Sequence, residues 1–304
     1  MLETLFVDAV CNASTIVHQL SNFLTKRDLL VFFVVADTMV RGYIDAIIDD
    51  MSSHKTEQSE QQKAIIHEWT MDQVRSASKP NFGKLFVTAP SLFSLLGNVD
   101  GQNVLELGCG NGYWLRLLTR AGAHCTGIDH AENQIEVAKL WDDSTTKQID
   151  FRIGNVGQDI DLQGKFDVVF FEHVLLEIPD INTLENAIKN AADALKPGGV
   201  LVISDIHPFA PSSKPSNLRV SDDFSYFKSG TPFEIQSNRV DGGVIYYKDV
   251  HWTLSDIAHA INRAGLKITD IIEPLPNSQD VEKYPDELGY RLNCPIAIMF
   301  KAIK

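Results

Sequence analysis

The chain has 304 residues, of which 44% are hydrophobic and 22% are charged, as is usual for a folded globular protein. Its formal net charge is −13, which disfavours nucleic acid and anionic membrane surfaces as partners, because both attract a surplus of Lys and Arg. Residues 29–35, the strongest apolar run, are too few to cross a bilayer, and no basic signal-peptide start is visible. We therefore expect a cytoplasmic protein that acts on small molecules.

Residues 1–63 predict a helical extension followed by a polar linker. The apolar positions surround the expected helices on nearly all sides, so this surface must be buried. A lid over a site, a structural cap and a subunit interface all satisfy that requirement. We favour a homodimer formed through these helices.

Four cysteines, Cys11, Cys109, Cys125 and Cys294, are scattered along the chain. They form no Cys-x-x-Cys pair and have no histidine at metal-ligand spacing. This distribution is typical of reduced thiols in a cytoplasmic protein, and it predicts no metal site.

An apolar strand expected at residues 103–107 runs directly into three glycines at alternate positions, Gly108, Gly110 and Gly112. Such a turn brings bare backbone against a ligand at the carboxyl end of a parallel strand. A dinucleotide fingerprint has its third glycine one residue later, and Glu106 beside the turn would repel a pyrophosphate. Both departures favour a ligand with a cationic amino acid end.

The next expected strand, residues 124–129, ends in an acid, Asp129, 17 residues after Gly112. A carboxylate at this place can accept hydrogen bonds from both hydroxyls of a ribose. The alternative is that Asp129 only caps the helix that begins near Ala131. Together with the glycine turn, the acid favours the ligand interpretation.

Strand and helix patterns alternate from about residue 98 to residue 206, which predicts right-handed crossovers and a parallel sheet covered on both faces. After Ile206 the pattern breaks, and residues 207–250 predict a β-rich insertion with a hairpin around Asp241-Gly242. Thr253 and Asp256 predict a capping box for a helix that stops at Gly265. The remaining strands are expected at residues 150–153, 167–172, 200–205, 266–273 and 295–302, and the helices at 114–121, 131–140 and 181–195.

The insertion is rich in aromatic residues, which favours an apolar or aromatic small molecule as ligand. Packing of the hairpin onto the core is the alternative for most of these rings. They are Phe209, Phe224, Tyr226, Phe227, Phe233, Tyr246, Tyr247 and Trp252.

The run from Glu106 to Gly112 resembles the first motif of class I S-adenosylmethionine-dependent methyltransferases. Weaker signals of the same family follow in order at residues 127–129, 154–156, 166–169 and 195–199. The resemblance covers residues 98–302 and points to the small-molecule branch, which contains ubiquinone- and menaquinone-biosynthesis-like and natural-product enzymes. It implies an α/β, Rossmann-like, seven-stranded and mostly parallel sheet in a methyltransferase domain over residues 64–304.

The resemblance also implies roles for residues along the carboxyl edge of this sheet. Glu106 would help to set the turn and reach the cofactor amino group through water, and Asp129 would hold the ribose with His130 beside it. Glu172 and His173 would lie near the sulfonium and the acceptor, and Trp69, Arg75 and Phe82 would be lid contacts. The other implied cofactor contacts are Gly108, Cys109, Gly110, Asn111 and Gly112 for the methionine part and Asn155 and Val156 for the adenine.

Methyl transfer needs a base only when the acceptor must lose a proton. The candidates are Glu172, whose pKa burial could raise, and His173, His207 and His251. Each has a structural alternative: Glu172 could bond backbone donors of the next segment, His207 could pin the insertion, and His251 could cap the hairpin.

We expect transfer of a methyl group from S-adenosylmethionine to oxygen, carbon or nitrogen of a small, apolar or aromatic metabolite. Two alternatives stay open, an aminopropyl-type transferase on the same fold and a non-catalytic subunit that binds S-adenosylmethionine.

Overall fold

A computed structural model describes residues 81–140, 148–158, 160, 162, 164–213, 218–238 and 244–304. The expected helical extension, Trp69, Arg75 and the turn at Asp241-Gly242 lie outside the described residues. No described helix has the length and apolarity needed to span a bilayer.

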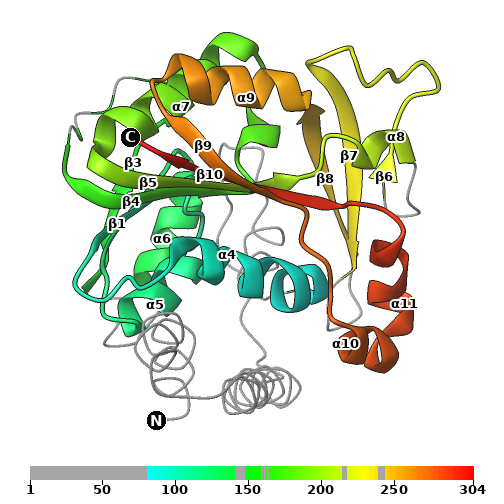
Figure 1. Ribbon diagram of the computed structural model, residues 1–304, viewed down its shortest axis with the longest axis horizontal. Coiled ribbons are helices and arrows are strands. Elements are labelled where there is room, and N and C mark those ends of the chain that lie inside the picture. Colours follow the sequence, from blue (N-terminus) through cyan, green and yellow to red (C-terminus); the bar gives the residue numbers. More distant parts are fainter. Residues whose placement is uncertain are drawn as a thin grey trace.

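A seven-stranded sheet forms the centre of the molecule, in the order β3-β2-β1-β4-β5-β10-β9 (Figure 1). Strands β1 to β5 are parallel, and β10 is antiparallel to both of its neighbours. The predicted fold class is therefore confirmed. The strands are β1 (Asn103–Leu107), β2 (His124–Asp129), β3 (Asp150–Ile153), β4 (Phe166–Glu172), β5 (Leu195–Ile206), β9 (Lys267–Ile272) and β10 (Ala297–Ile303).

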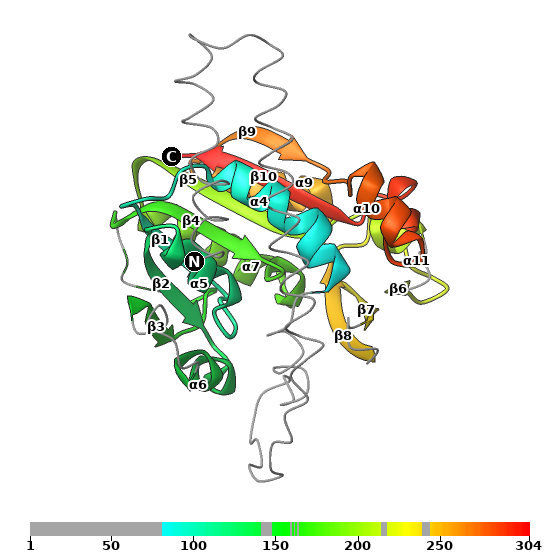
Figure 2. The same cartoon turned by 90° about the horizontal axis from the view of Figure 1, so that it is seen from below.

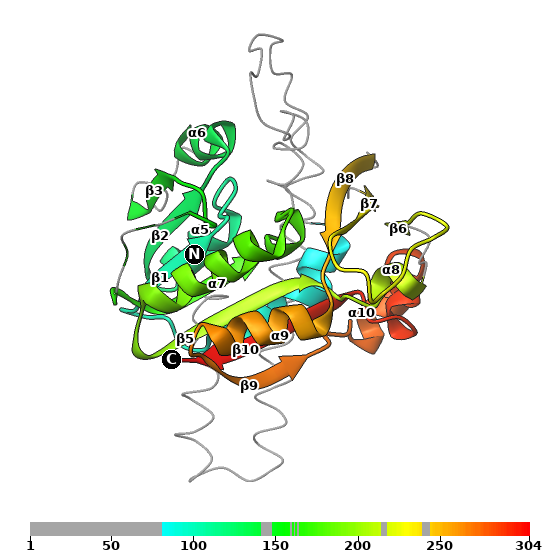
Figure 3. The ribbon, with the colours of Figure 1, turned by 90° about the horizontal axis from the view of Figure 1, so that it is seen from above.

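Helices cover both faces of this sheet because alternate residues of each buried strand point to opposite faces. Phe170 packs with Leu92 of α4 (Ala89–Leu96) and Trp114 of α5 (Tyr113–Arg120) on the face seen in Figure 2. Phe171 packs on the other face with α7 (Ile181–Ala194) and α9 (Leu254–Arg263). Figure 3 shows these two helices on that face of the sheet. α6 (Glu132–Leu140) joins the first group.

Strand β5 begins five residues earlier than the sequence predicts. Leu195 already pairs with Phe166, and the Lys196 ammonium lies 2.7 Å from Asp167 Oδ1. A register irregularity between Phe166 and Val168 accommodates the Lys-Pro-Gly-Gly turn. Because these contacts hold the turn against β4, it belongs to the strand rather than to a loop.

The insertion after β5 is β-rich, as predicted, and forms a separate three-stranded antiparallel sheet. Phe233, Ile235 and Leu218 make its small core with Ile296, which precedes β10. The predicted capping box of α9 is present, with Thr253 and Asp256 bonding each other's backbone N–H. The insertion contains α8 (Ala210–Ser213), β6 (Leu218–Arg219), β7 (Thr231–Asn238) and β8 (Val244–His251).

Two short segments that the sequence does not predict meet at the carboxyl edge of the sheet. One is a π-helical turn, η1 (Lys84–Thr88), which leads into α4. The other joins β9 to β10 through α10 (Ser278–Lys283), α11 (Pro285–Leu288) and η4 (Gly289–Leu292). They share an apolar cluster in which Phe82 stacks against Phe86 and packs against Tyr284, so the predicted lid contact Phe82 lies within this cluster.

Candidate active site

All three glycines of the turn after β1 adopt positive φ, at 77° for Gly108, 51° for Gly110 and 77° for Gly112. A Cβ on Gly108 would lie 2.4 Å from Val174 Cγ2, and one on Gly112 would lie 2.5 Å from the Phe151 ring. Internal packing therefore requires glycine at 108 and 112. At Gly110 such a Cβ would make an ordinary contact of 3.6 Å with the Gln134 side chain, so only the positive φ favours glycine there.

Asp129 ties the glycine turn to the end of β2. One carboxylate oxygen accepts the Gly110 N–H at 2.7 Å, and the other accepts the Ala131 N–H at 2.8 Å. The structural alternative for Asp129 is thus present in the structure. It leaves room for a ligand role, because each carboxylate oxygen has two lone pairs.

The other residues expected near the ribose and adenine lie on the loops that follow β2 and β3. The imidazole of His130 is 3.7 Å from Asp129 Oδ1. Asn155 accepts the Gly157 N–H in a tight turn, and the Val156 carbonyl accepts a bond from Asn190. Asn111 accepts a bond from the buried Arg116 through its backbone carbonyl, which fixes the end of the glycine turn.

Glu106 is a buried acid at the end of β1, and its side-chain oxygen Oε2 has no hydrogen-bond partner among the described residues. Burial and the nearby Glu172 carboxylate raise the pKa of Glu106 well above its ordinary value. A buried acceptor without a partner is costly, so this oxygen marks a place where a ligand can donate hydrogen bonds.

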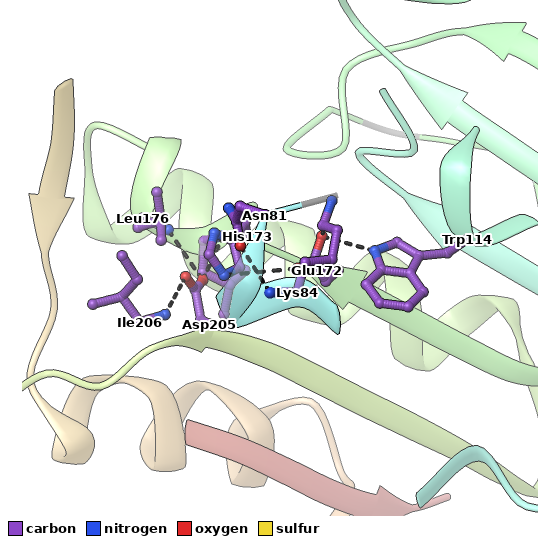
Figure 4. Close-up of polar contacts among 9 residues, drawn as sticks. Asn81, Lys84, Trp114, Glu172, His173, Leu176, Asp205 and Ile206 are labelled. Carbon is purple, nitrogen blue, oxygen red and sulfur yellow. Dashed lines mark hydrogen bonds and ion pairs between the residues drawn. The ribbon is translucent and has the colours of Figure 1, made fainter. Parts of the chain in front are cut away.

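Glu172 lies at the end of β4 and, unlike Glu106, is fully paired (Figure 4). Its Oε2 accepts the indole N–H of Trp114 at 2.9 Å and lies 3.5 Å from the ammonium of Lys84. Burial disfavours its ionised form, but Lys84, His173 and Trp114 outweigh burial and lower the pKa of Glu172. The expectation of a raised pKa is therefore wrong, and Glu172 is an ionised carboxylate.

Lys84 is a site residue that sequence reasoning missed. The π-helical turn places its ammonium 5.1 Å from the ring centre of Tyr113 and 5.3 Å from that of Trp114. The faces of two aromatic rings and the Glu172 carboxylate therefore hold the Lys84 ammonium in place. A single lysine before the first strand has no motif, and its π-helical placement, which is frequent at functional sites, has no sequence signature.

His173 follows Glu172 in a strained conformation. Its φ of 56° makes it the only non-glycine residue with positive φ in the described part of the chain. Its N–H bonds the Ser204 carbonyl, and its ring Nε2 is 3.6 Å from Glu172 Oε1. Desolvation and the charges of Lys84 and Arg291 lower the pKa of His173 despite Glu172, so the imidazole is neutral at neutral pH.

The structure does not bring His207 and His251 to Glu172. His207 accepts the Phe209 N–H through Nδ1 and pairs with Glu273 through Nε2 at 2.9 Å. The His251 Nε2 lies 2.7 Å from the Tyr226 carbonyl oxygen. Both rings line a separate cavity of about 20 Å³ beneath the insertion, which has room for one water. Their contacts match the structural alternatives.

Asp205, at the end of β5, lines the same cavity and is also absent from the sequence prediction. Its carboxylate accepts the N–H groups of Leu175, Leu176 and Ile206, which fixes the short 3₁₀ turn η3 (Leu175–Glu177) after β4 (Figure 4). Burial raises the pKa of Asp205 to about 8. Its role here is to position the segment that follows His173.

A family profile described as "Methyltransferase domain" matches residues 83–271, which is more than half of the chain. The chain belongs to this methyltransferase family. A ubiquinone biosynthesis O-methyltransferase of Bradyrhizobium diazoefficiens is 34% identical over 112 residues, covering 37% of this chain and 43% of that protein. Its counterpart from Xanthomonas euvesicatoria is 30% identical over 173 residues, covering 56% and 65%. The methyltransferase chain thus spans about half the length of the curated relatives it matches.

Solved structures show the same fold. An S-adenosylmethionine-dependent methyltransferase from Mesorhizobium loti aligns with a TM-score of 0.57 and 23% identity, over 71% of this chain and 96% of that one. A second such structure, described as putative, from Listeria monocytogenes has a TM-score of 0.56 and 20% identity, over 76% and 98%. The resemblance to class I S-adenosylmethionine-dependent methyltransferases is therefore confirmed.

The described residues of this methyltransferase suit the cofactor of its family, S-adenosylmethionine. The unpartnered oxygen of Glu106 provides a buried acceptor for an ammonium group, next to the glycine turn that follows β1. Cys109 is buried, and burial raises its thiol pKa, so it is inert as a nucleophile. Among the described residues, no group of three His, Cys, Asp or Glu side chains could hold a metal ion.

Proposed function

We propose that this chain transfers the methyl group of S-adenosylmethionine to a hydroxyl oxygen of a small, largely apolar or aromatic molecule. The observation that carries the proposal is Glu106, a buried acid with one oxygen unpartnered at the end of β1. The family membership and the O-methyltransferase relatives support the reaction class. A neutral imidazole at the end of β4 supports an oxygen acceptor, since a hydroxyl must lose its proton.

The binding residues follow from their places along the sheet edge. Glu106 would accept hydrogen bonds from the amino acid end of the cofactor, Asp129 would receive the ribose hydroxyls, and Asn155 and Val156 would border the adenine. S-adenosylmethionine supplies a methyl group on a positively charged sulfur, which is already activated for displacement. The chain therefore has to align the acceptor oxygen and keep water out.

His173 is the proposed base. Its Nε2 faces the Glu172 carboxylate, so the other ring nitrogen, Nδ1, would take the proton from the acceptor hydroxyl as the methyl group leaves sulfur. Glu172 stays ionised and stabilises the imidazolium that forms, while Trp114 and Lys84 hold Glu172 in place. Glu172 is thus a positioning residue, and His207 and His251 have no part in this proposal.

Calorimetric titration of S-adenosylhomocysteine tests the proposed binding of the cofactor. Wild type should bind it, Asp129→Ala should bind at least tenfold more weakly, and Glu106→Gln should also bind at least tenfold more weakly because a hydrogen bond to the charged ammonium group is worth about 1.5–3 kcal/mol. Asp193→Asn, an exposed acid paired with Lys189, is the control and should bind normally. Absence of binding to wild type would refute the proposal.

Methyl transfer to a set of phenols and catechols tests the chemistry. His173→Gln should lower kcat by 10²–10⁴-fold, the usual contribution of a general base, with S-adenosylhomocysteine affinity unchanged. For wild type, kcat/KM should rise with pH through a midpoint below the ordinary histidine pKa, because partial desolvation and the charges of Lys84 and Arg291 lower the pKa of His173. Cofactor binding without transfer to any acceptor would favour the non-catalytic alternative.

The domain boundary near residue 64, the homodimer through residues 1–63, the absence of a nucleic-acid partner and the cytoplasmic location stay predictions. A truncation that starts at Ala64 tests the first two. Sedimentation should show the full chain as a dimer and the truncated chain as a folded monomer. An unchanged oligomeric state would contradict the homodimer.

A further inference from the structure

Arg291 is a cationic residue at the acceptor end of the site. Its guanidinium lies 5.2 Å from the ring centre of Tyr290, and no carboxylate pairs with it within the described residues. It belongs to η4, just before β10, and Ala297 at the start of β10 pairs with Ile206 at the end of β5. The antiparallel direction of β10 therefore places η4 at the edge where β4 and β5 end. This is the edge on which His173 lies.

The contacts of the guanidinium fix its place more closely. A Cβ added to Gly83 would lie 2.7 Å from Arg291 Nη2, so the guanidinium fills the space that any other side chain at position 83 would need. Its Nε is buried without a hydrogen-bond partner in the described structure. Its charge also reaches His173, where it lowers the pKa of the imidazole. The guanidinium thus lies against Gly83 at the start of the η1 turn, close enough to His173 to influence its charge, and its Nε has no hydrogen-bond partner among the described residues.

Of the basic residues around the site, only Arg291 is charged and has no carboxylate partner among the described residues. Lys84 is neutralised by Glu172 at 3.5 Å, and the His173 imidazole is neutral at neutral pH. Arg291 is always protonated, and a partly desolvated arginine without an anion is costly. The chain has a net charge of −13, so an arginine in the site without a carboxylate partner indicates a ligand with a single negative charge.

We propose that Arg291 binds a carboxylate of the methyl acceptor, so that the substrate class is a small hydroxylated carboxylic acid. This inference rests on the proposed function. The planar guanidinium matches a carboxylate through two parallel hydrogen bonds, which fixes the orientation of the acceptor as well as its affinity. Anchoring one end at Arg291 would direct a hydroxyl at the other end toward His173.

The cofactor also has a carboxylate, and the sheet order argues against it as the partner of Arg291. Glu106 and the glycine turn lie on β1, whereas Arg291 precedes β10, and both β4 and β5 stand between these strands. Lys84 lies closer to the glycine turn, next to Trp114. Arg291 is therefore on the acceptor side of the site.

Matched pairs of carboxylates and their uncharged amides test the proposal. We would titrate 4-hydroxybenzoate, 3,4-dihydroxybenzoate, 4-hydroxycinnamate and 4-hydroxyphenylacetate, each with its primary amide, into the full chain saturated with S-adenosylhomocysteine. Wild type should bind at least one carboxylate tenfold or more tightly than its amide. Arg291→Met should abolish this preference and leave S-adenosylhomocysteine affinity unchanged, and Arg291→Lys should keep part of it.

A second variant acts without touching the arginine. Gly83→Ala should displace the guanidinium and weaken carboxylate binding several-fold, because position 83 has an ordinary helical φ and its only close neighbours are side chains. Gly289→Ala, where an added Cβ meets nothing within 4 Å, should bind like wild type. Arg263→Met, which removes an exposed partner of Glu185, controls for loss of any arginine and should also bind like wild type.

Three results would overturn the inference. They are the absence of a carboxylate preference in all four pairs, a preference that survives in Arg291→Met, and a fall in S-adenosylhomocysteine affinity in Arg291→Met, which would assign the anion to the cofactor. Failure of wild type to bind S-adenosylhomocysteine would refute the proposed function instead, so the two failures are distinguishable.

Discussion

The two halves of the sheet edge are built in different ways. At β1 and β2, the glycine turn and Asp129 are held by backbone groups close in sequence or on the adjacent strand, such as the Gly110 N–H and the Ile128 carbonyl. At β4, β5 and β10, the charged residues come from segments far apart in the chain, with Lys84 from η1, Glu172 from β4 and Arg291 from η4. The first half is fixed by backbone geometry, and the second by side chains that distant elements bring together, of which Lys84 and Glu172 form an ion pair.

This difference also separates the two buried acids. Glu106, in the first half, has an unpartnered oxygen and a raised pKa, so its environment is incomplete without a ligand. Glu172, in the second half, is paired by the protein itself and has a lowered pKa. The acid proposed to bind the cofactor and the acid proposed to position His173 thus differ in their partners, although they face the same side of the sheet.

Gly108→Ala should have the largest effect on the first half. The new Cβ would clash with Val174, and alanine is strained at a φ of 77°, so we expect a loss of about 3 kcal/mol or more in unfolding free energy. Gly164→Ala, at a φ of 63° with open space around it, should cost only about 1 kcal/mol. Urea denaturation measures both, and equal losses would show that packing does not fix the turn.

Asp205→Asn should change how stability depends on pH. Because burial raises the pKa of Asp205 to about 8, the folded state keeps a proton that the unfolded chain releases near pH 4. The wild type should therefore lose about 1.4 kcal/mol of stability per pH unit from this residue as the pH rises between these values. Asp205→Asn should remove that slope, giving a difference of about 3 kcal/mol between pH 5 and pH 7. Parallel stability curves for the two proteins would contradict a protonated Asp205.

Lys84→Met tests the charge pairing of the second half. Removing the cation leaves Glu172 buried without its counter-ion, and we expect a loss of about 2 kcal/mol. The pKa of Glu172 is lowered in the folded state, so the loss should be greatest above about pH 5 and shrink as the pH falls. Lys189→Met, which breaks an exposed pair with Asp193, should cost at most about 0.5 kcal/mol. A pH-independent loss would point to packing of the lysine stem instead.

The smallest expected effect on stability concerns His173. There the difference in stability between the glycine and the alanine variant should have the opposite sign to that at an ordinary helical position. At a φ of 56°, His173→Gly should be about 1 kcal/mol more stable than His173→Ala, since only glycine adopts this conformation without strain. At His259, an exposed position within α9, the order should reverse by about the same amount. Both comparisons require only thermal or urea unfolding. The same order at both sites would show that His173 is unstrained.

The sequence predicted the half of the sheet edge at β1 and β2, because its structure depends on residues that are close in sequence. Strand and helix patterns gave all seven strands of the central sheet, and the alternating glycines located the turn that follows β1. The motif also brought Glu106 and Asp129 into the site. These features depend on residues within about 25 positions of each other, so periodicity and turn chemistry are sufficient to find them.

The second half was only partly predictable. Glu172 and His173 were predicted as site residues because they lie at the end of β4. The pKa of Glu172 was predicted to be raised, whereas it is lowered, because the sequence did not reveal the nearby Lys84. Lys84 and Arg291 have no motif and meet the site only through the π-helical turn and the packing of Phe82 on Tyr284. Histidines 207 and 251 were candidates by residue type alone, and their hydrogen bonds serve the insertion.

The antiparallel strand β10 has a consequence for synthesis on the ribosome. Its place in the sheet is between β5 and β9, yet about 90 residues separate the end of β5 from the start of β10. At typical elongation rates this segment takes roughly 5–20 s to make, during which the outer edge of β5 has no partner strand. Nascent chains should therefore be most prone to aggregation and chaperone binding in this interval, and pausing of translation after Ile206 should lower the yield of folded protein.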